Sequence, residues 1–167
     1  MRTILILSFS FALLLHTGCG RDDGRPADMP PLFPVSITVI QDGQPLEGAS
    51  VVLIAQAPAV PQYGRSSGTT TAAGIARPRT HGFDGVPAGE YTVVIEKRVT
   101  EGVQQIVDAE GEVVGSVGGR IYQLVDAQFA TEAASTLSIS VAERRGATET
   151  FDVGAAARMF LFQHTSD

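Results

Sequence analysis

The chain has 167 residues, which is enough for one compact domain but not for two ordinary ones. Its 18 acidic and 12 basic side chains give a formal net charge of −6 at pH 7. This acidic balance argues against nucleic-acid binding, which needs clustered Lys and Arg around phosphates. Cys19 is the only cysteine, so no disulfide can form within the chain and the core alone must hold the fold.

Residues 1–18 predict a signal peptide. Residues 4–15 form an uncharged apolar run that is too short to span a bilayer comfortably. Two small residues then precede Cys19, a pattern that resembles the lipobox of bacterial lipoproteins, whose cysteine receives a diacylglyceryl thioether and becomes the mature N-terminus. His16 departs from that pattern, which usually has an aliphatic residue there. The alternative is an ordinary secretory signal with an incidental cysteine. An exported protein with one unpaired thiol is unusual, which favours lipidation of Cys19.

Residues 19–34 are expected to contain the anchor cysteine and a flexible linker. They are polar and rich in Gly and Pro, so they would hold the folded domain away from a membrane. Gly20 follows the cysteine at a position where an inner-membrane retention signal often has Asp. The resemblance to lipoproteins therefore implies export and lipid anchoring to the bacterial cell envelope, at the outer membrane.

Residues 35–153 predict an all-β domain of about seven short strands. Residues 35–40 alternate apolar side chains with Ser and Thr, as a half-buried strand does. Residues 49–55 are more continuously apolar, which predicts a central strand covered on both faces. The predicted strands are residues 35–40, 49–55, 69–71, 75–80, 91–96, 136–141 and 148–153. Many short strands with frequent turns favour an antiparallel sandwich.

Turn residues separate these strands. Asp42-Gly43 is one of the strongest tight-turn dipeptides, and Gly74 is free to take a positive φ angle. Pro78 is expected to break the fourth predicted strand, because proline cannot donate a ladder hydrogen bond. Gly146 is expected to turn the chain so that the last two strands pair with each other.

The segment 98–129 is the least regular part of the sequence. Residues 108–111 have the composition of a turn and lie between two valine-containing stretches. This pattern suits either a protruding hairpin or a short helix followed by a loop, and the glycines after residue 114 argue against a long helix. In the tail, residues 154–167, the apolar residues 159–162 are expected to pack on another element or to fold back as a strand.

Two motifs resemble those of carboxypeptidase regulatory-like domains. Residues 43–51, GQPLEGASV, match the family's opening G-x-P-L-x-G-A-x-V, and residues 86–93, VPAGEYTV, match its closing V-P-A-G-x-Y-x-V. Thr71 stands where the family has an acid, and Asp126 and Phe129 stand where many small lipoproteins with this domain have Pro and Tyr. The structural positions of the motifs are Gly43, Pro45, Gly48, Gly74, Pro87, Gly89 and Tyr91.

The resemblance covers roughly residues 35–153 and implies a transthyretin-like, prealbumin-type sandwich of seven antiparallel, Ig-like strands. Members of the family are mostly non-catalytic accessory or surface modules, so the resemblance implies a fold more than an activity. Glu90 and Tyr91 cannot converge on one substrate, because neighbours in a strand point to opposite faces. We expect the Tyr91 ring to lie in the core with its hydroxyl bonded to the backbone, and Glu90 to face water.

The sequence contains no evident catalytic set. After the signal peptide the histidines are His81, in a turn context, and His164, in the tail, and Cys19 is used by the anchor. The tail also lacks the Tyr-Arg-Gly-Ser-type ending of hydroxyisourate hydrolases, which resemble transthyretin. Intradiol dioxygenases hold iron with two Tyr and two His, but no pair here has that family's local spacing. The residues of those types are Tyr63, Tyr91, Tyr122, His81 and His164.

The sequence therefore predicts a non-catalytic, lipid-anchored β-sandwich module that binds an envelope protein or a glycan. We expect attachment to a membrane through the N-terminal lipid, and no cofactor, metal or nucleic acid. The alternative is a small-ligand or metal-dependent enzyme on the same sandwich, with His81, Tyr63 and the segment 98–129 around its site. Proximity of the two histidines to each other and to a tyrosine would favour the enzyme.

Overall fold

The computed structural model describes residues 24–57 and 60–163 of the chain. The predicted signal peptide, the anchor Cys19 and His164 therefore lie outside the described residues. The described part is mostly β, with one short helix, α1 (Ala127–Ala130), at whose start the Asp126 side chain accepts a hydrogen bond from the Gln128 backbone amide. No helix in this part of the chain is long and apolar enough to cross a membrane.

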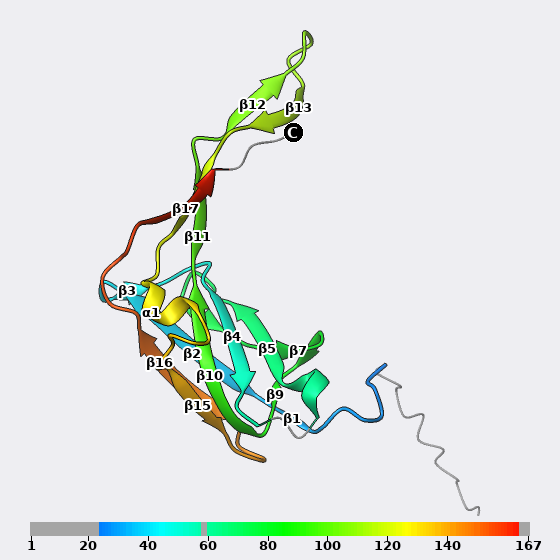
Figure 1. Ribbon diagram of the computed structural model, residues 1–167. Helices are drawn as coiled ribbons and strands as arrows, with labels where there is room; N and C mark the ends of the chain where they lie inside the picture. Colours follow the sequence, from blue (N-terminus) through cyan, green and yellow to red (C-terminus); the bar gives the residue numbers. More distant parts are fainter. Residues whose placement is uncertain (1–23, 58–59, 164–167) are drawn as a thin grey trace, which may run out of the picture.

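The strands are short, and most pair with neighbours in antiparallel fashion (Figure 1). In chain order they are β1 (Leu32–Phe33), β2 (Val35–Gln41), β3 (Gln44–Pro45), β4 (Ser50–Ala55), β5 (Arg65–Thr69), β6 (Ile75–Ala76), β7 (Arg79–Thr80), β8 (Phe83–Asp84), β9 (Val86–Pro87), β10 (Gly89–Glu96), β11 (Arg98–Glu101), β12 (Gln104–Val107), β13 (Val113–Val117), β14 (Arg120–Gln123), β15 (Ser138–Val141), β16 (Ala147–Asp152) and β17 (Met159–Gln163). A 3₁₀ turn, Pro61–Tyr63, precedes β5.

The larger sheet has the strand order β15-β10-β4-β5-β7-β8, and all of its pairs are antiparallel. β4 is a central strand, as its apolar run predicts. Its inward side chains Val51 and Leu53 are fully buried, but the alternate side chains on the outer face are only partly buried. The prediction of a strand covered on both faces is therefore wrong, because the core lies against one face of this sheet.

The smaller sheet contains β16, β2 and β3 in that order, with β6 also paired to β2. β16 runs parallel to β2, so that Phe151 lies opposite Val39. The predicted hairpin between the last two strands is therefore wrong, and so is the prediction of purely antiparallel pairing. After β15 only an isolated bridge forms across the turn at Gly146, and the chain then crosses to the other sheet, where Phe151 and Val153 become buried in the core.

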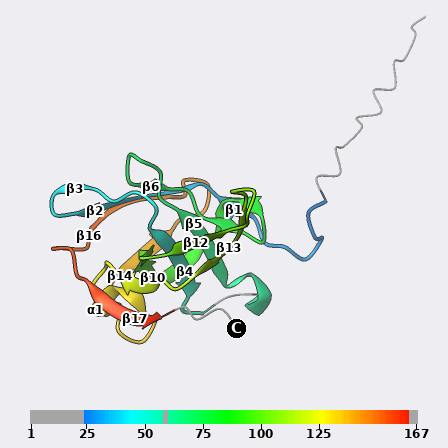
Figure 2. The ribbon, with the colours of Figure 1, turned by 90° about the horizontal axis from the view of Figure 1, so that it is seen from above.

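One hydrophobic core fills the space between the two sheets, whose backbones Figure 2 shows from above. β2 supplies Val35, Ile37 and Val39 from alternate positions, as the alternating sequence predicts, because successive side chains of a strand point to opposite faces. β10 and β15 face them with Tyr91 and Ile139 among others. At about 25 cal/mol per Å² of apolar surface removed from water, this burial is the main contribution that stabilises the fold.

Part of the predicted flexible linker is folded against the domain. Leu32 and Phe33 form β1 and pair with β9, and Met29 is buried. The carboxylate of Asp28 accepts hydrogen bonds from the Tyr63 hydroxyl at 3.0 Å and from the Gln62 side chain at 2.8 Å. The linker expectation is therefore corrected for these residues, whose apolar side chains find partners that the polar composition of the segment does not reveal.

The segment after β10 leaves the two sheets as a long β extension (Figure 1). β11 pairs with β14, and farther out β12 pairs with β13, so the hairpin interpretation is confirmed and the helical one is wrong. The tail returns along the base of this extension, where β17 pairs with β14, which confirms the prediction that residues 159–162 fold back as a strand.

Candidate functional site

The first motif shapes a hairpin. Asp42 and Gly43 have φ angles of 51° and 71° and connect β2 to β3, as predicted for a tight Asp-Gly turn. Pro45 lies in β3 opposite Ile40 and is exposed. These positions therefore serve the backbone and present no reactive group.

Gly48 and Gly74 complete the same corner. The Gly48 amide donates to the Thr70 carbonyl at 2.9 Å, and the Gly74 carbonyl accepts from the Val39 amide at 2.8 Å. Gly74 has the predicted positive φ, 73°, and a Cβ there would lie 2.6 Å from the Val39 carbonyl oxygen. The close approach of two backbone segments explains the glycine.

The second motif fixes a buried tyrosine. The Tyr91 ring is only 2 % exposed, and its hydroxyl donates to the Pro87 carbonyl at 2.8 Å, which confirms the expected core position and backbone partner. Burial raises the pKa of Tyr91 to about 12. Glu90 points to the other face, is exposed, and accepts a hydrogen bond from the Ser140 hydroxyl. The two neighbours therefore form no joint site, as the strand geometry predicts.

Of the candidate metal-binding tyrosines and histidines, His164 lies outside the described residues, and among those that the structure describes Tyr63 and His81 lie together. Their ring centroids are 5.2 Å apart in an edge-to-face arrangement, and His81 Nε2 is 2.8 Å from the Gln62 carbonyl oxygen. Tyr63 donates to Asp28, and its pKa is raised, mainly by burial and then by that carboxylate. In residues 24–57 and 60–163, no group of three or more His, Cys, Asp and Glu side chains could hold a metal ion.

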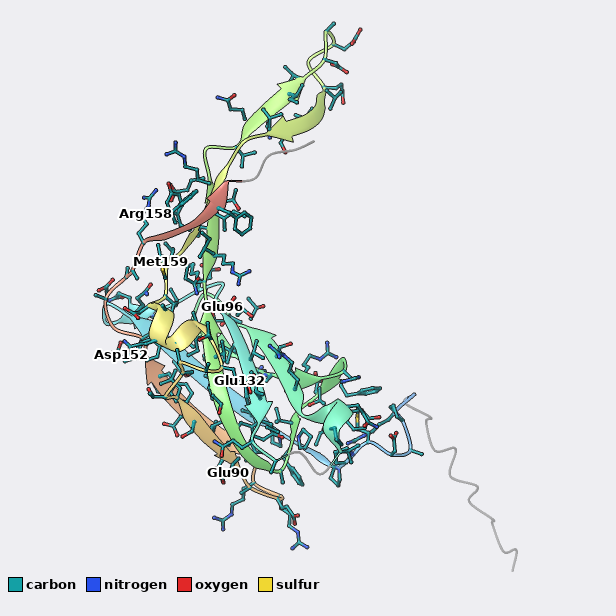
Figure 3. All side chains as sticks on the ribbon, viewed as in Figure 1. Glu90, Glu96, Glu132, Asp152, Arg158 and Met159 are labelled. Carbon is teal, nitrogen blue, oxygen red and sulfur yellow. The ribbon has the colours of Figure 1, made fainter. Side chains whose placement is uncertain are left out.

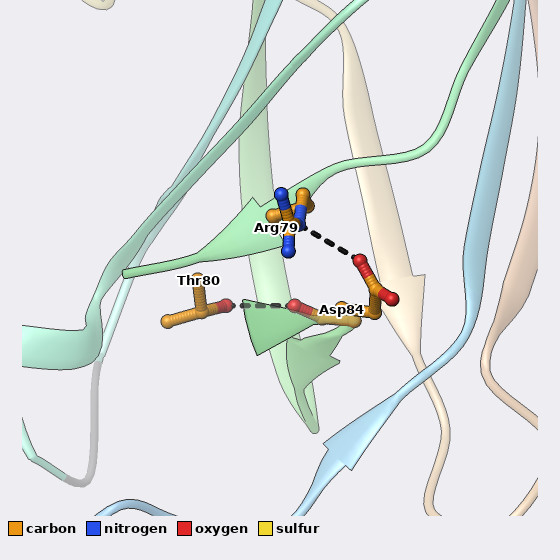
Figure 4. A network of polar contacts seen from close by, with 4 residues as sticks. Arg79, Thr80 and Asp84 are labelled. Atoms are coloured by element: carbon orange, nitrogen blue, oxygen red, sulfur yellow. Dashed lines mark hydrogen bonds and ion pairs between the residues drawn. The ribbon is translucent and has the colours of Figure 1, made fainter. Parts of the chain in front are cut away.

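A tight turn presents His81. The turn joins β7 to β8, with φ angles of 49° at His81 and 86° at Gly82. The Arg79 Nε–Asp84 Oδ1 ion pair of 2.8 Å bridges it, and Thr80 is buried beside it (Figure 4). Because the Thr80 hydroxyl donates its one proton to the Gly85 carbonyl, it accepts from Ser66. These contacts pair the polar side chains of the turn with other groups of the protein itself.

The other two tyrosines among the candidates lie apart from this turn. Tyr91 lies in the core and Tyr122 lies in β14.

The most unusual surface is the β extension. We call residues 98–123 together with β17 the arm, with the paired strands β11, β14 and β17 as its stem and the β12–β13 hairpin as its outer part. Ten large apolar side chains in the arm are between 38 % and 61 % exposed. They are Val103, Ile106, Val107, Val113, Val114, Val117, Met159, Phe160, Leu161 and Phe162. Among the described residues, these ten make up the exposed large hydrophobic side chains.

Polar and aromatic contacts stiffen the stem. Arg158 lies just before β17 (Figure 3). Its guanidinium lies over the Tyr122 ring, 4.2 Å from its centroid, and forms an ion pair with Glu101. Phe160 meets the same ring edge-to-face, with centroids 5.9 Å apart. Hydrogen bonding from Arg158 and then Arg120 lowers the pKa of Tyr122, since both stabilise the phenolate. These contacts hold β17 and the residue before it against β14 and β11.

An open depression of about 530 Å³ lies where the stem meets the outer hairpin. Its lining includes Gly118 and Gly119, which lie between β13 and β14 and have φ angles of 71° and 113°. Arg120, Arg158 and Glu101 supply its charged groups, and the Arg158–Glu101 ion pair already satisfies two of them. Arg158 covers one face of the Tyr122 ring, and Phe160 contacts that ring in an edge-to-face arrangement.

The tip of the arm is acidic. Asp108 Oδ1 accepts from the backbone amides of Glu110 at 3.1 Å and Glu112 at 2.8 Å, and Gly111 has a φ of 84°. This confirms the predicted turn at 108–111 and gathers three carboxylates at the end of the hairpin. The arm therefore carries acidic residues at its tip, apolar residues along its length and arginines at its stem.

The sequence indicated a hairpin here and placed segment 98–129 around the alternative enzyme site, but it did not identify the hairpin as an exposed apolar surface. The sequence did contain a signal for such a surface. A strand with one face on a core alternates apolar and polar side chains, and the two valine-containing stretches lack this strict alternation.

No family model matches the chain, and no curated protein or solved structure matches it with statistical significance.

Proposed function

We propose that the protein is a non-catalytic, lipid-anchored module of the bacterial envelope that contacts a partner protein through its arm. The observation that carries this proposal is the set of ten exposed apolar side chains on the arm. Large apolar side chains left exposed together on one extension are typical of protein interaction sites.

The arm contributes nothing to the core of the domain. The core cluster contains residues of both sheets and Val125, but none from residues 98–123 or β17. An isolated two-stranded hairpin is only marginally stable in water, and exposed apolar strands carry a risk of aggregation. An element with these costs and no packing role in the domain is best explained by contact with a partner.

The composition of the arm favours a protein over a glycan as that partner. Its outer part presents aliphatic side chains, Val and Ile, with free strand edges. Sugar recognition usually needs a free aromatic face and clustered polar groups, whereas Arg158 already occupies one face of the stem's Tyr122. The Tyr63–His81 pair is bonded to Asp28 and the Gln62 backbone, which gives the enzyme alternative little support.

The finer assignments of the fold and the cellular location belong to the same proposal. We assign the two sheets to a transthyretin-like, carboxypeptidase regulatory-like domain, supported by the positions of Gly74, Pro87 and Tyr91 in tight backbone contacts. Export and lipid anchoring at the outer membrane rest on the apolar run and on Cys19.

Site-specific photo-crosslinking of the full-length protein in bacterial membranes tests the role of the arm. A photoreactive residue placed at Val107, in the outer hairpin, is expected to give a discrete crosslinked protein band. Glu132 is the matched control, because it is also exposed but lies on the domain next to α1 (Figure 3).

The result is read by comparing the two positions. A band at Val107 and none at Glu132 supports docking through the arm, whatever the identity of the partner. Equal labelling at both positions, or none at Val107, contradicts it. A variant whose residues 102–119 are replaced by an Asn-Gly turn serves as the second control and should lose the band.

A further inference from the structure

We propose that the arm docks against the arm of a second copy of this chain, with the two β11–β12 edges antiparallel. This proposal rests on the function proposed above, because it names the partner of the same surface. Three features of the arm support it: an open strand edge, a separation of charge along the arm, and exposed apolar side chains on the open edge.

The open edge is the one formed by β11 and β12. β11 pairs only with β14, and β12 pairs only with β13, in the part of the chain that the structure describes. On the opposite side of the arm, β17 covers β14, so a strand running along β13 would meet β17 at the stem. The β11–β12 edge, from Arg98 to Val107, is therefore the longer free edge for backbone pairing.

The charges of the arm are self-complementary. The tip carries Asp108, Glu110 and Glu112, whereas Lys97 lies at the stem end of the open edge, beside Arg98, which is ion-paired with Glu96 at 2.8 Å. If two such edges pair over their length in antiparallel fashion, the tip of each arm lies beside the stem of the other. An interface with twofold symmetry makes this contact twice, and a parallel arrangement would instead place the two acidic tips together.

Apolar side chains on the open edge add to a weak, specific dimer. Val103, Ile106 and Val107 are exposed along this edge, and in an edge-to-edge pair they would pack beside the strand of the second copy. Pairing would also satisfy the free backbone groups of β12. The charged ends then determine the direction of pairing, since aliphatic side chains alone do not.

Antiparallel pairing of two open edges places the twofold axis near the middle of the edge, at Val103. Disulfide crosslinking tests this position. In the full-length chain, Val103→Cys is expected to crosslink to itself under mild oxidation, whereas Glu110→Cys alone does not. The double variant Lys97→Cys/Glu110→Cys is expected to crosslink between copies. The parent chain, oxidised in parallel, shows any background from Cys19.

A charge exchange tests the same geometry without a covalent bond. Glu110→Lys and Lys97→Glu are each expected to weaken self-association at least about tenfold in dissociation constant, measured by sedimentation of the full chain in detergent. A mixture of the two variants is expected to associate as the parent does, because each reversed tip then meets a reversed stem.

The outcomes separate this inference from the proposed function. Crosslinking at Val103 with recovery in the mixture supports the antiparallel dimer. Self-crosslinking of Glu110→Cys alone would indicate parallel arms and overturn it. A photo-crosslink at Val107 to a protein of a different mass, with no crosslinking at Val103, overturns the dimer but leaves the arm as a docking surface. No crosslink at either position overturns both.

Discussion

At the scale of single residues, Tyr91 combines a buried ring with one backbone hydrogen bond. Tyr91→Phe removes the donor to the Pro87 carbonyl and is expected to lower the free energy of unfolding by about 1 kcal/mol. Urea unfolding measures this loss. Tyr122→Phe is the control, because Tyr122 lies in the arm and its loss should cost less than about 0.5 kcal/mol. Equal effects of the two changes would contradict the core role of Tyr91.

The same residue predicts a loss of stability in alkali. The folded-state pKa of Tyr91 is about 12, above the ordinary value of 10.0, so the unfolded chain ionises first. Its contribution to stability is complete below pH 10 and is lost as the pH rises toward 12. The difference in unfolding free energy between the parent and Tyr91→Phe should therefore shrink over this range.

Gly74 and Gly48 form a matched pair for testing the corner of the smaller sheet. Both have positive φ angles, 73° and 68°, so an alanine at either position is strained by about 1–2 kcal/mol. A Cβ at Gly74 would also lie 2.6 Å from the Val39 carbonyl oxygen, whereas at Gly48 nothing lies within 4 Å. Gly74→Ala should therefore destabilise the fold more than Gly48→Ala in the same unfolding assay. The reverse order would show that the close approach is not maintained.

These residues were accessible to sequence reasoning because each is governed by its neighbours in the chain. A Gly at a turn and a Tyr four residues after its proline partner are local features. The Tyr122, Arg158 and Glu101 contacts were not predicted, because they join residues far apart in sequence through the return of β17.

At the scale of elements, the arm is separable from the domain. Replacing residues 102–119 by an Asn-Gly turn joins Glu101 to Arg120, which already lie opposite each other in the β11–β14 pair. The melting temperature of the variant should remain within about 3 °C of the parent, because no residue of the arm belongs to the core. Circular dichroism during heating measures it, and a large drop would mean that the arm supports the sheets.

Element pairing shows where local pattern stops being informative. The alternation of residues 148–153 predicted a strand, but alternation does not distinguish pairing with β15 from pairing with β2. The parallel pairing with β2 places Phe151 and Val153 in the core, a long-range choice that packing decides. In contrast, the hairpin with a turn at 108–111 could be recognised, because its turn lies between its own strands.

At the scale of the whole molecule, the two sheets share one core while the arm extends beyond them (Figure 1). The domain is complete without the arm in terms of packing, and the apolar surface of the arm needs a partner in order to leave water. This division of roles is why a membrane anchor matters to the proposed function. Anchored chains share one surface, which raises their effective concentration for weak contacts between arms.

Lipidation of Cys19 is the prediction on which that arrangement depends. The chain purified from membranes is expected to have an intact mass that lacks residues 1–18 and includes a diacylglyceryl group on the cysteine. Cys19→Ala removes the only thiol, so this variant should lack the added lipid mass and should not be anchored to the membrane by a lipid. Intact-mass spectrometry of both forms measures this, with washed membranes separating anchored from released protein. A soluble, unmodified mature form of the parent would contradict lipidation. The dimer would then form without the raised effective concentration at a membrane, so contacts between the arms would have to supply all of its affinity.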